Sequence, residues 1–367
     1  MKSDVLVVGA GPAGLTTAIV AARNGLRVTV GDARRPPINK PCGEGLLPEA
    51  VDALRGIGIE LNSSLGYLLE GFRFSDSTHS VSAPMAHKRS FGLRRTVLHN
   101  LLVGRAVEAG VNLRWGARVS DFARGGAKIN GEPVSFDWLV GADGQNSSVR
   151  KWAKLNSLQP AQKRFGFRRH FSITPWSKFV EVHWGKRCQM VVTPTHAAEV
   201  CISFFTSDLN LRIDGALPQF PEIAARLEGA TLITPEQGTT VSLMSARRVA
   251  TDRVALVGDA SCSVDGIAGH GLSLGLQEAR YLGEALARGD LSLYESAHRR
   301  IASRPLRMTR LLLLMGRSTW IRKKALRLFE RKPELFSRLI TIHTGRPPDT
   351  AFDAKEIVEL GWRVFRA

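Results

Sequence analysis

Residues 4–32 read DVLVVGAGPAGLTTAIVAARNGLRVTVGD, and this stretch decides the fold. The apolar run at 4–8 predicts a buried parallel strand, and the segment at 15–25 predicts a helix that stops at a glycine. A second β-branched run then leads to Asp32. Strand, glycine turn, helix and strand in this order indicate an α/β protein that opens with a Rossmann-type unit.

The glycine turn has the spacing G-x-G-x-x-G. Gly9 permits the tight turn, Gly11 lets the backbone approach a pyrophosphate, and Gly14 lets the helix pack closely on the strand. Asp32 stands where a carboxylate accepts hydrogen bonds from a ribose. We therefore predict a dinucleotide site; the alternative is a glycine turn with a purely structural role.

Composition limits what surrounds this unit. The chain has 367 residues, 44% hydrophobic residues and a net charge of +18, which predict two or three subdomains and anionic partners. Nucleotide phosphates, nucleic acid and an anionic membrane all fit that charge. No nucleic-acid motif occurs, and aromatic residues total 7% without interleaving the basic ones, so we expect no nucleic-acid partner.

The four cysteines are Cys42, Cys188, Cys201 and Cys262, and none forms a C-x-x-C pair. Neither a zinc site nor a disulfide scaffold is indicated, and we expect no metal. The N-terminus has no signal-peptide pattern, and no run reaches the roughly 18 apolar residues of a membrane span. We expect a cytoplasmic protein. The sequence gives no signal of its oligomeric state.

Three further segments extend the pattern: FGLRRTVL at 91–98, LVGADGQNSSVR at 139–150 and VALVGDASCSVDGIAGHGLSLG at 254–275. With the glycine turn, they resemble the motifs of the flavoprotein superfamily that contains aromatic hydroxylases of the p-hydroxybenzoate hydroxylase type and geranylgeranyl reductases. The resemblance covers about the first 300 residues and implies FAD as cofactor. It also implies electrons from NADH, NADPH or a separate reductase.

The resemblance places Arg95 at the FAD phosphates and Asp259 at the ribityl chain; Asp143, Gly144, Ser147 and Arg150 match the second motif. The full set of expected cofactor contacts is Gly9, Gly11, Ala13, Gly14, Asp32, Ala33, Arg34, Gly43, Arg95, Val119, Asp143, Gly144, Gly258, Asp259, Gly269, Gly271 and Leu272.

The motif segments place two aspartates at one edge of the predicted sheet, where a ligand would bind. Asp143 and Asp259 each follow a predicted strand, and ligands bind at the carboxyl ends of strands in open α/β sheets. Residues 269–289 predict a helix whose N-terminus carries about half a positive charge. We expect it beneath N1 and the C2 carbonyl of the flavin; the alternative is an ordinary capped amphipathic helix. His270 is a candidate catalytic residue with a pKa near neutrality, or else a solvated turn histidine.

Three regions are expected. Residues 1–71, 95–160 and 246–300 would form a discontinuous FAD domain, and 72–94 with 161–245 an antiparallel substrate sheet over the flavin. Residues 301–367 would form a basic helical region, because twelve Lys or Arg and one acid lie between Arg299 and Lys332. One interpretation is a cap that packs its apolar stripe on the FAD domain; another is peripheral contact with an anionic membrane.

Two chemistries follow from the resemblance. The hydroxylases transfer oxygen from a flavin C4a-hydroperoxide, and the reductases saturate prenyl double bonds. The C-G-E-G tetrad at 42–45 matches the reductases, whereas their aromatic-x-Trp-x-Phe-Pro pattern is missing around Pro194. We favour a monooxygenase of secondary metabolism that hydroxylates a hydrophobic aromatic or polyketide-like molecule. The alternatives are a lipid double-bond reductase and a flavoprotein that modifies a partner protein.

The tetrad supplies two further candidates for catalysis. The flanking glycines would let the backbone pass close to the flavin, so that Cys42 is a soft neighbour of the ring and Glu44 a proton donor or an orienting acceptor. The alternative is a buried loop cysteine beside a solvated glutamate.

Overall fold

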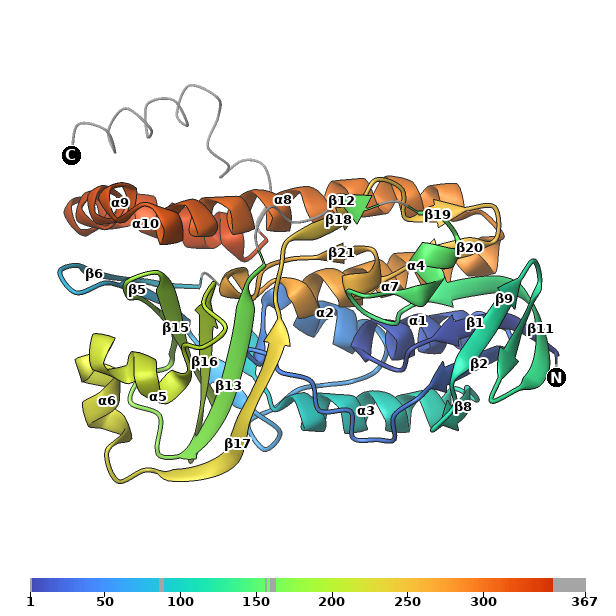
Figure 1. Ribbon diagram of the computed structural model, residues 1–367, viewed down its shortest axis with the longest axis horizontal. Helices are drawn as coiled ribbons and strands as arrows, with labels where there is room; N and C mark the ends of the chain where they lie inside the picture. The colour runs from blue at the N-terminus through green and yellow to red at the C-terminus, as the bar shows by residue number, and fades with distance from the viewer. Residues whose placement is uncertain (1, 86–88, 156, 159–162, 346–367) are drawn as a thin grey trace.

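The computed structural model describes residues 2–85, 89–155, 157–158 and 163–345. Within these residues, an eight-stranded sheet and a seven-stranded sheet form the two halves of the molecule. Figure 1 shows them side by side, with long helices along one edge of both. The expected combination of a Rossmann-type sheet, an antiparallel sheet and C-terminal helices is confirmed.

The opening stretch forms the centre of the eight-stranded sheet. Strand β1 (Lys2–Val8) leads into helix α1 (Pro12–Arg23) and returns as β2 (Val28–Asp32), which pairs parallel to β1. From Val5 to Val8, β1 is continuously apolar and buried, as in a strand with both faces covered. This is the strand, turn, helix and strand that the sequence predicts.

The strand order of this sheet is β19-β20-β11-β1-β2-β8, with β10 and β9 attached through β11. The additional strands are β8 (Asn112–Trp115), β9 (Val119–Ala123), β10 (Gly126–Ile129), β11 (Glu132–Gly141), β19 (Ala250–Thr251) and β20 (Val254–Leu256). β11 and β20 run parallel to β1, so the loops after β1, β11 and β20 meet at one edge.

Helices α1, α3 (Arg95–Glu108) and α7 (Gly271–Arg288) pack on this sheet and on one another. A Cβ at Gly283 would lie 2.6 Å from the Cβ of Val20, so the small residue lets α7 and α1 approach closely. The hydrophobic core between these helices and the sheet fixes the direction in which each helix points its N-terminus.

The seven-stranded sheet has the order β17-β13-β16-β15-β14-β5-β6. Its strands are β5 (Gly71–Ser75), β6 (Ser80–Pro84), β13 (Phe165–Ser172), β14 (Phe179–Trp184), β15 (Cys188–His196), β16 (Glu199–Thr206) and β17 (Thr231–Thr240). All neighbouring pairs are antiparallel except β14 with β5. Two segments distant in sequence therefore build one sheet. A helix, α6 (Pro221–Leu227), interrupts the segment between β16 and β17.

Short elements connect these layers. They are β3 (Gly45–Leu46), α2 (Pro48–Gly56), β4 (Tyr67–Leu69), β7 (Ser90–Gly92), α4 (Ser148–Trp152), β12 (Ser157–Leu158), α5 (Ile213–Ala216), η1 (Leu217–Gln219), β18 (Met244–Ala246), η2 (Gly258–Ala260), β21 (Cys262–Ser263) and η3 (Gly266–Ala268).

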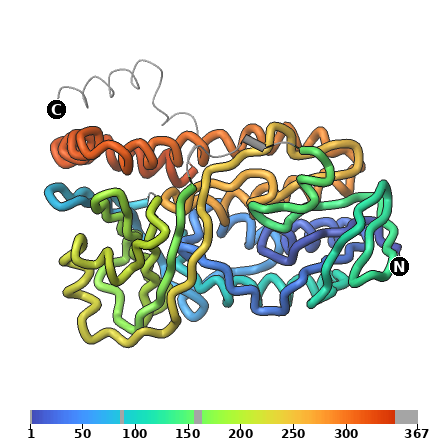
Figure 2. Tube along the Cα trace, in the orientation of Figure 1, coloured from blue at the N-terminus to red at the C-terminus, as the bar shows by residue number. Residues whose placement is uncertain are grey.

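The C-terminal region consists of α8 (Leu291–Arg317), α9 (Thr319–Arg331) and α10 (Pro333–His343). Figure 2 shows α8 extending along most of the molecule. Asp290 caps its start, so α8 begins ten residues before the expected boundary at 301. Residues 346–367 of the predicted basic region lie outside the described residues.

The apolar stripe of these helices is buried. Met308, Leu312 and Met315 of α8, with Phe329 and Phe336, form one hydrophobic cluster with residues of β5 and β14. The cap therefore packs on both halves: α8 lies against α7 of the predicted FAD domain, as expected, and α9 and α10 lie against β6 of the antiparallel sheet. In the described part of the chain, no helix combines the length and apolar character needed to cross a membrane.

Candidate functional site

A cavity of about 830 Å³ lies where the two sheets meet. One part of its wall comes from the loops after β1, β2, β11 and β20, which carry the sequence motifs. The other part is mainly apolar and includes Leu69, Phe72, Met85, Val180, Val182, Val191, Phe205 and Ile267. The cavity therefore joins a motif-bearing end to a hydrophobic end.

The glycine turn lines the first end. Gly9 has a φ of +105°, and a Cβ there would overlap the carbonyl of Ala142. A Cβ on Gly14 would overlap the carbonyl oxygen of Gly9, so this glycine is needed for the approach of α1 to β1. At Gly11 a Cβ would meet nothing within 4 Å, and Gly11 lines the cavity. The open space at Gly11 is where a phosphate could reach the backbone.

Asp32 is held at the rim of this end. Its Oδ2 accepts a hydrogen bond from the Ala10 N–H at 2.9 Å, and its Oδ1 accepts one from the Arg34 N–H at 2.8 Å. Each carboxylate oxygen keeps a further lone pair. The backbone thus orients the buried side chain, which can accept a hydrogen bond from a hydroxyl group of a bound ribose.

Arg95 brings a buried cation to the cavity. It is 6% exposed at the start of α3, and its Nη1 has no hydrogen-bond partner among the described residues. Burial lowers its pKa. Asp143 likewise lines the cavity with one carboxylate oxygen unpartnered in that part of the chain, while its other oxygen accepts from the Ser148 N–H at 2.6 Å. Such orphaned groups fit a polar ligand.

The third motif places Asp259 across the cavity from the loop after β2. Lys40 Nζ donates to Asp259 Oδ2 at 2.6 Å. Burial alone would raise the pKa of Asp259, but the Lys40 ammonium outweighs burial and the pKa is lowered. Sequence reasoning missed this pairing, because no local signal links residues so far apart in the chain.

Two buried side chains fix the turn that carries Asp259. Arg150 of the second motif donates from Nη1 to the carbonyl of Ala260 at 2.8 Å. Glu278 of α7 accepts from the Gly258 N–H at 2.6 Å and from Ser261 Oγ at 2.8 Å. The second and third motifs are thereby held together. Glu278 was not predicted from the sequence.

The start of α7 reaches the cavity without its histidine. Gly269, Gly271 and Leu272 line the wall, whereas His270 does not. Its Nε2 donates to the carbonyl of His343 at 3.0 Å, and burial together with the charge of Arg304 lowers the pKa of His270 to about 4. The expected pKa near neutrality is therefore wrong; His270 is a buried neutral residue that ties α7 to the end of α10.

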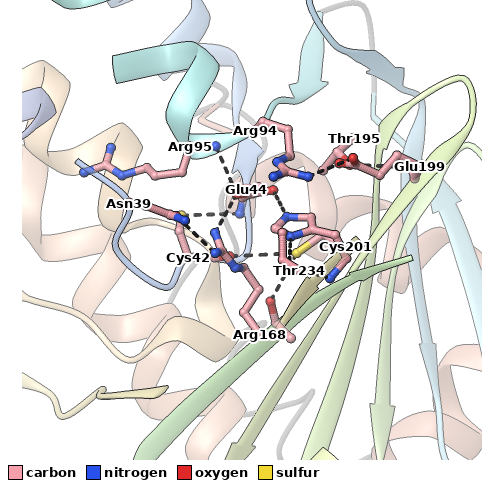
Figure 3. Close-up of polar contacts among 12 residues, drawn as sticks. Asn39, Cys42, Glu44, Arg94, Arg95, Arg168, Thr195, Glu199, Cys201 and Thr234 are labelled. Atoms are coloured by element: carbon pink, nitrogen blue, oxygen red, sulfur yellow. Dashed lines mark hydrogen bonds and ion pairs between the residues drawn. The ribbon is translucent and has the colours of Figure 1, made fainter. Parts of the chain in front are cut away.

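The loop with Cys42 and Glu44 passes between the glycine-rich fold and the antiparallel sheet (Figure 3). Glu44 has a φ of +59° and is 1% exposed. Its Oε1 accepts from the Arg95 N–H and from Arg168 Nη1, each at 2.9 Å, and its Oε2 lies 2.6 Å from Nε2 of His170. Three polar groups thus surround the carboxylate, an arrangement that suits the orienting acceptor of its two expected roles.

Cys42 lines the cavity beside Glu44. Its Sγ accepts from the Glu44 N–H at 3.3 Å. Burial raises the pKa of the thiol, despite the nearby Arg95. The raised pKa favours the neutral thiol at this position of the cavity wall.

Arg168 and His170 of β13 were missed in the sequence. Arg168 Nη2 also donates to Asn39 Oδ1 at 3.1 Å and to Gln237 Oε1 at 2.7 Å. The segment FRRH places charged residues inside an otherwise apolar strand, which was the available signal. Its partner Glu44 lies in a distant loop and could not be assigned.

Glu44, His170 and Cys201 bring three possible metal ligands within 4.8 Å of one another. The set suits a cation poorly, because the Arg168 guanidinium already pairs with Glu44. Burial also raises the pKa of the Cys201 thiol well above its ordinary value, whereas a metal ligand must be a thiolate.

The cavity wall contains most of the predicted residues. Of the expected cofactor contacts, Gly14 does not line it and serves helix packing; the others do. Cys42 and Glu44 also line it. The cavity thus collects residues from every motif, although contact with a cofactor remains a prediction for each.

Comparison with known proteins gives a family match. The model of a family described as FAD binding domain matches residues 2–201. The chain is 28% identical to a menaquinone reductase from Mycolicibacterium smegmatis, with 81% of this chain and 79% of the relative covered. It is also 28% identical to a 6-methylpretetramide 4-monooxygenase from Streptomyces rimosus, with 94% and 92% covered.

Among solved structures, the flavin-dependent brominase Bmp2 superposes with a TM-score of 0.80 at 18% identity, covering 100% of this chain and 99% of the brominase. At that identity the similarity concerns the fold alone. The whole chain, including both sheets and the C-terminal helices, follows an architecture found in another protein.

Proposed function

The chain belongs to the FAD binding domain family, and on that premise we propose that it is an FAD-dependent monooxygenase that hydroxylates a hydrophobic aromatic or polyketide-like small molecule. The observation that carries this proposal is the shared cavity. Its motif-bearing end suits a dinucleotide, and its apolar wall suits a greasy ring system beside it.

The residues present fit FAD. Gly9, Gly11 and the N-terminus of α1 would receive the pyrophosphate, and the orphaned Nη1 of Arg95 would neutralise it. Asp32 would accept hydrogen bonds from the ribose hydroxyls, and Asp259 would accept hydrogen bonds from the ribityl chain. The start of α7 would face the flavin ring. When bound, FAD supplies the two-electron redox chemistry and the activation of oxygen.

The protein's own part is to bind, orient and exclude water. The apolar wall contributed by β5, β14 and β15 removes water from the substrate. Cys42 and the backbone of the 42–45 loop contact the reacting region, and Glu44 holds that loop against β13. The full-length similarity to a 6-methylpretetramide 4-monooxygenase supports a polycyclic substrate of secondary metabolism.

A second candidate is a reductase of quinone-lipid or prenyl double bonds. The neutral thiol of Cys42 within the cavity wall favours it, as does the similarity to a menaquinone reductase. This function would use the same cofactor and the same apolar wall, with a double bond rather than an aromatic ring as the target.

Two finer points belong to the proposal. NADH or NADPH would reduce the flavin.

Peripheral membrane contact would use the exposed face of the C-terminal helices, where Leu311, Leu314 and Trp320 accompany basic side chains. The buried apolar stripe of these helices instead supports a cap as their main role. Co-sedimentation with phosphatidylserine vesicles tests the membrane contact. Equal binding to phosphatidylserine vesicles and to neutral vesicles would refute it.

Rapid mixing tests the main proposal. The FAD-loaded protein is reduced anaerobically with NADPH and then mixed with oxygen, with and without a neutral polycyclic phenol. We expect oxygen consumption matched by hydroxylated product. Anaerobic turnover that saturates a prenyl side chain, with no oxygen requirement, would instead support the reductase.

A further inference from the structure

Arg168 occupies a special place in the cavity wall. Of the described residues that the seven-stranded sheet contributes to this wall, Arg168 is the only charged one. The others are apolar or carry hydroxyls, such as Thr193 and Ser203, or are glycine. The net charge that the antiparallel sheet gives to the cavity wall therefore depends on whether this guanidinium is paired with an anion.

The guanidinium is paired with an acid, although its Nε has no hydrogen-bond partner among the described residues. Arg168 is 1% exposed, and its Nη1 lies 2.9 Å from Oε1 of Glu44. Its Nη2 is bound by two amide oxygens, of Asn39 and Gln237. A buried charge needs a partner to offset its lost hydration, and Glu44 supplies it. The pair as a whole is electrically neutral.

The remaining cations of the cavity wall come from the nucleotide fold. They are Arg34, Lys40, Arg95 and Arg118. Lys40 is paired with Asp259, and Arg95 has the geometry expected of a phosphate contact. No described residue of the antiparallel sheet thus offers the cavity an uncompensated positive charge.

We propose that Glu44 is a specificity-determining residue that restricts the substrate to uncharged molecules. By neutralising Arg168, it removes the one cation that the sheet, among its described residues, brings to the cavity wall and that could receive a substrate carboxylate. A carboxylated aromatic entering the cavity would lose its hydration and meet Glu44 as a second negative charge beside Arg168. A neutral ring with carbonyl or hydroxyl oxygens meets no such penalty. The inference rests on the proposed function only in placing the substrate in this cavity.

The test compares two ligands of nearly the same shape. The FAD-loaded protein is titrated with 6-hydroxy-2-naphthoate and with its methyl ester at pH 8, and binding is read from the perturbation of the flavin absorbance. No reductant is present, so the result does not depend on whether the protein hydroxylates or reduces. We expect the wild-type protein to bind the ester at least tenfold more tightly than the acid.

Substitution of Glu44 should change that ratio. In Glu44→Gln the acid should bind at least tenfold more tightly than in the wild type, because Arg168 becomes free to pair with it. The double variant Glu44→Gln with Arg168→Gln should lose this gain. Glu199→Gln is the matched control: Glu199 pairs with Arg94 at 2.8 Å and does not line the cavity, so the ratio should stay unchanged.

A second variant covers the case in which Glu44→Gln fails to retain FAD. Thr240 lines the cavity at an exposed position of β17, and Thr240→Lys should admit the acid by adding an unpaired cation. The proposal is overturned if the wild-type protein binds the acid as well as the ester or binds neither. It is also overturned if no folded, FAD-loaded variant with an added or released cation gains acid binding.

Discussion

Arg94 and Arg95 are adjacent in sequence but have opposite surroundings. Arg94 Nη1 pairs with Glu199 Oε2 at 2.8 Å, and Arg95 points away from that pair, with no partner for its Nη1 in the part of the chain that the structure describes (Figure 3). A hydrogen bond to a charged group contributes about 1.5–3 kcal/mol. Arg95→Met should therefore weaken FAD binding by roughly 10- to 150-fold, measured by titrating the apoprotein with FAD. Arg94→Met should change FAD affinity less than threefold; equal losses in both variants would contradict the assignment.

His270 makes stability depend on pH. Its pKa is lowered from 6.5 to about 4 in the folded protein, so protonation favours the unfolded chain. The stabilisation is fully present above pH 6.5 and is lost as pH falls from 6.5 towards 4, by about 3 kcal/mol. Urea unfolding at several pH values should show this part of the slope missing in His270→Gln. An unchanged slope in His270→Gln would refute the prediction.

At the level of residues, the sequence revealed those that belong to a local motif. Gly9, Gly11 and Asp32 could be assigned because their roles depend on near neighbours in the chain. Lys40 and Arg168 could not, since their partners are distant in sequence: Asp259 meets Lys40 at one edge of the eight-stranded sheet, and Glu44 meets Arg168 where the two sheets pack together. The error at His270 has the same origin: a turn that looks solvated is covered by α10.

At the level of elements, two glycines of the same turn have different roles: Gly14 serves the stability of the fold, and Gly11 serves the predicted binding of FAD. Gly14→Ala would push its Cβ into the Gly9 carbonyl, so α1 must move from β1; we expect a loss of about 1–3 kcal/mol in the free energy of unfolding of the apoprotein. Gly11→Ala meets open space and should cost under about 1 kcal/mol. Yet its methyl group would occupy the phosphate position and abolish FAD binding. Thermal unfolding with FAD titration checks both; equal apoprotein stabilities in the two variants would refute it.

Elements were predictable where pattern and caps agree. β1, α1 and α7 appear close to their expected bounds, and α7 ends at Gly289 in the left-handed region, as a terminal glycine predicts. The start of α8 was not predicted, because the change in charge composition comes after the Asp290 cap. A composition boundary and a helix boundary are different features.

At the level of the whole molecule, the two sheets meet at the cavity, and the C-terminal helices lie along one edge of both sheets (Figure 1). The sequence indicated each layer, but the packing of the basic helices on the antiparallel sheet depends on their buried aromatic residues. Phe336 packs its ring against Phe74 at 5.0 Å. The cap thereby supports the sheet that forms the apolar wall, which links the C-terminal helices to substrate binding.

Oxygen labelling tests the central claim most directly. The FAD-loaded protein is incubated with NADPH under ¹⁸O₂ and a panel of neutral hydroxynaphthalenes, hydroxyanthraquinones and a prenylated naphthoquinone, and products are analysed by mass spectrometry. We predict a phenolic or anthraquinone product that carries one ¹⁸O atom. Saturation of the prenyl double bond with no ¹⁸O in any product would contradict a monooxygenase.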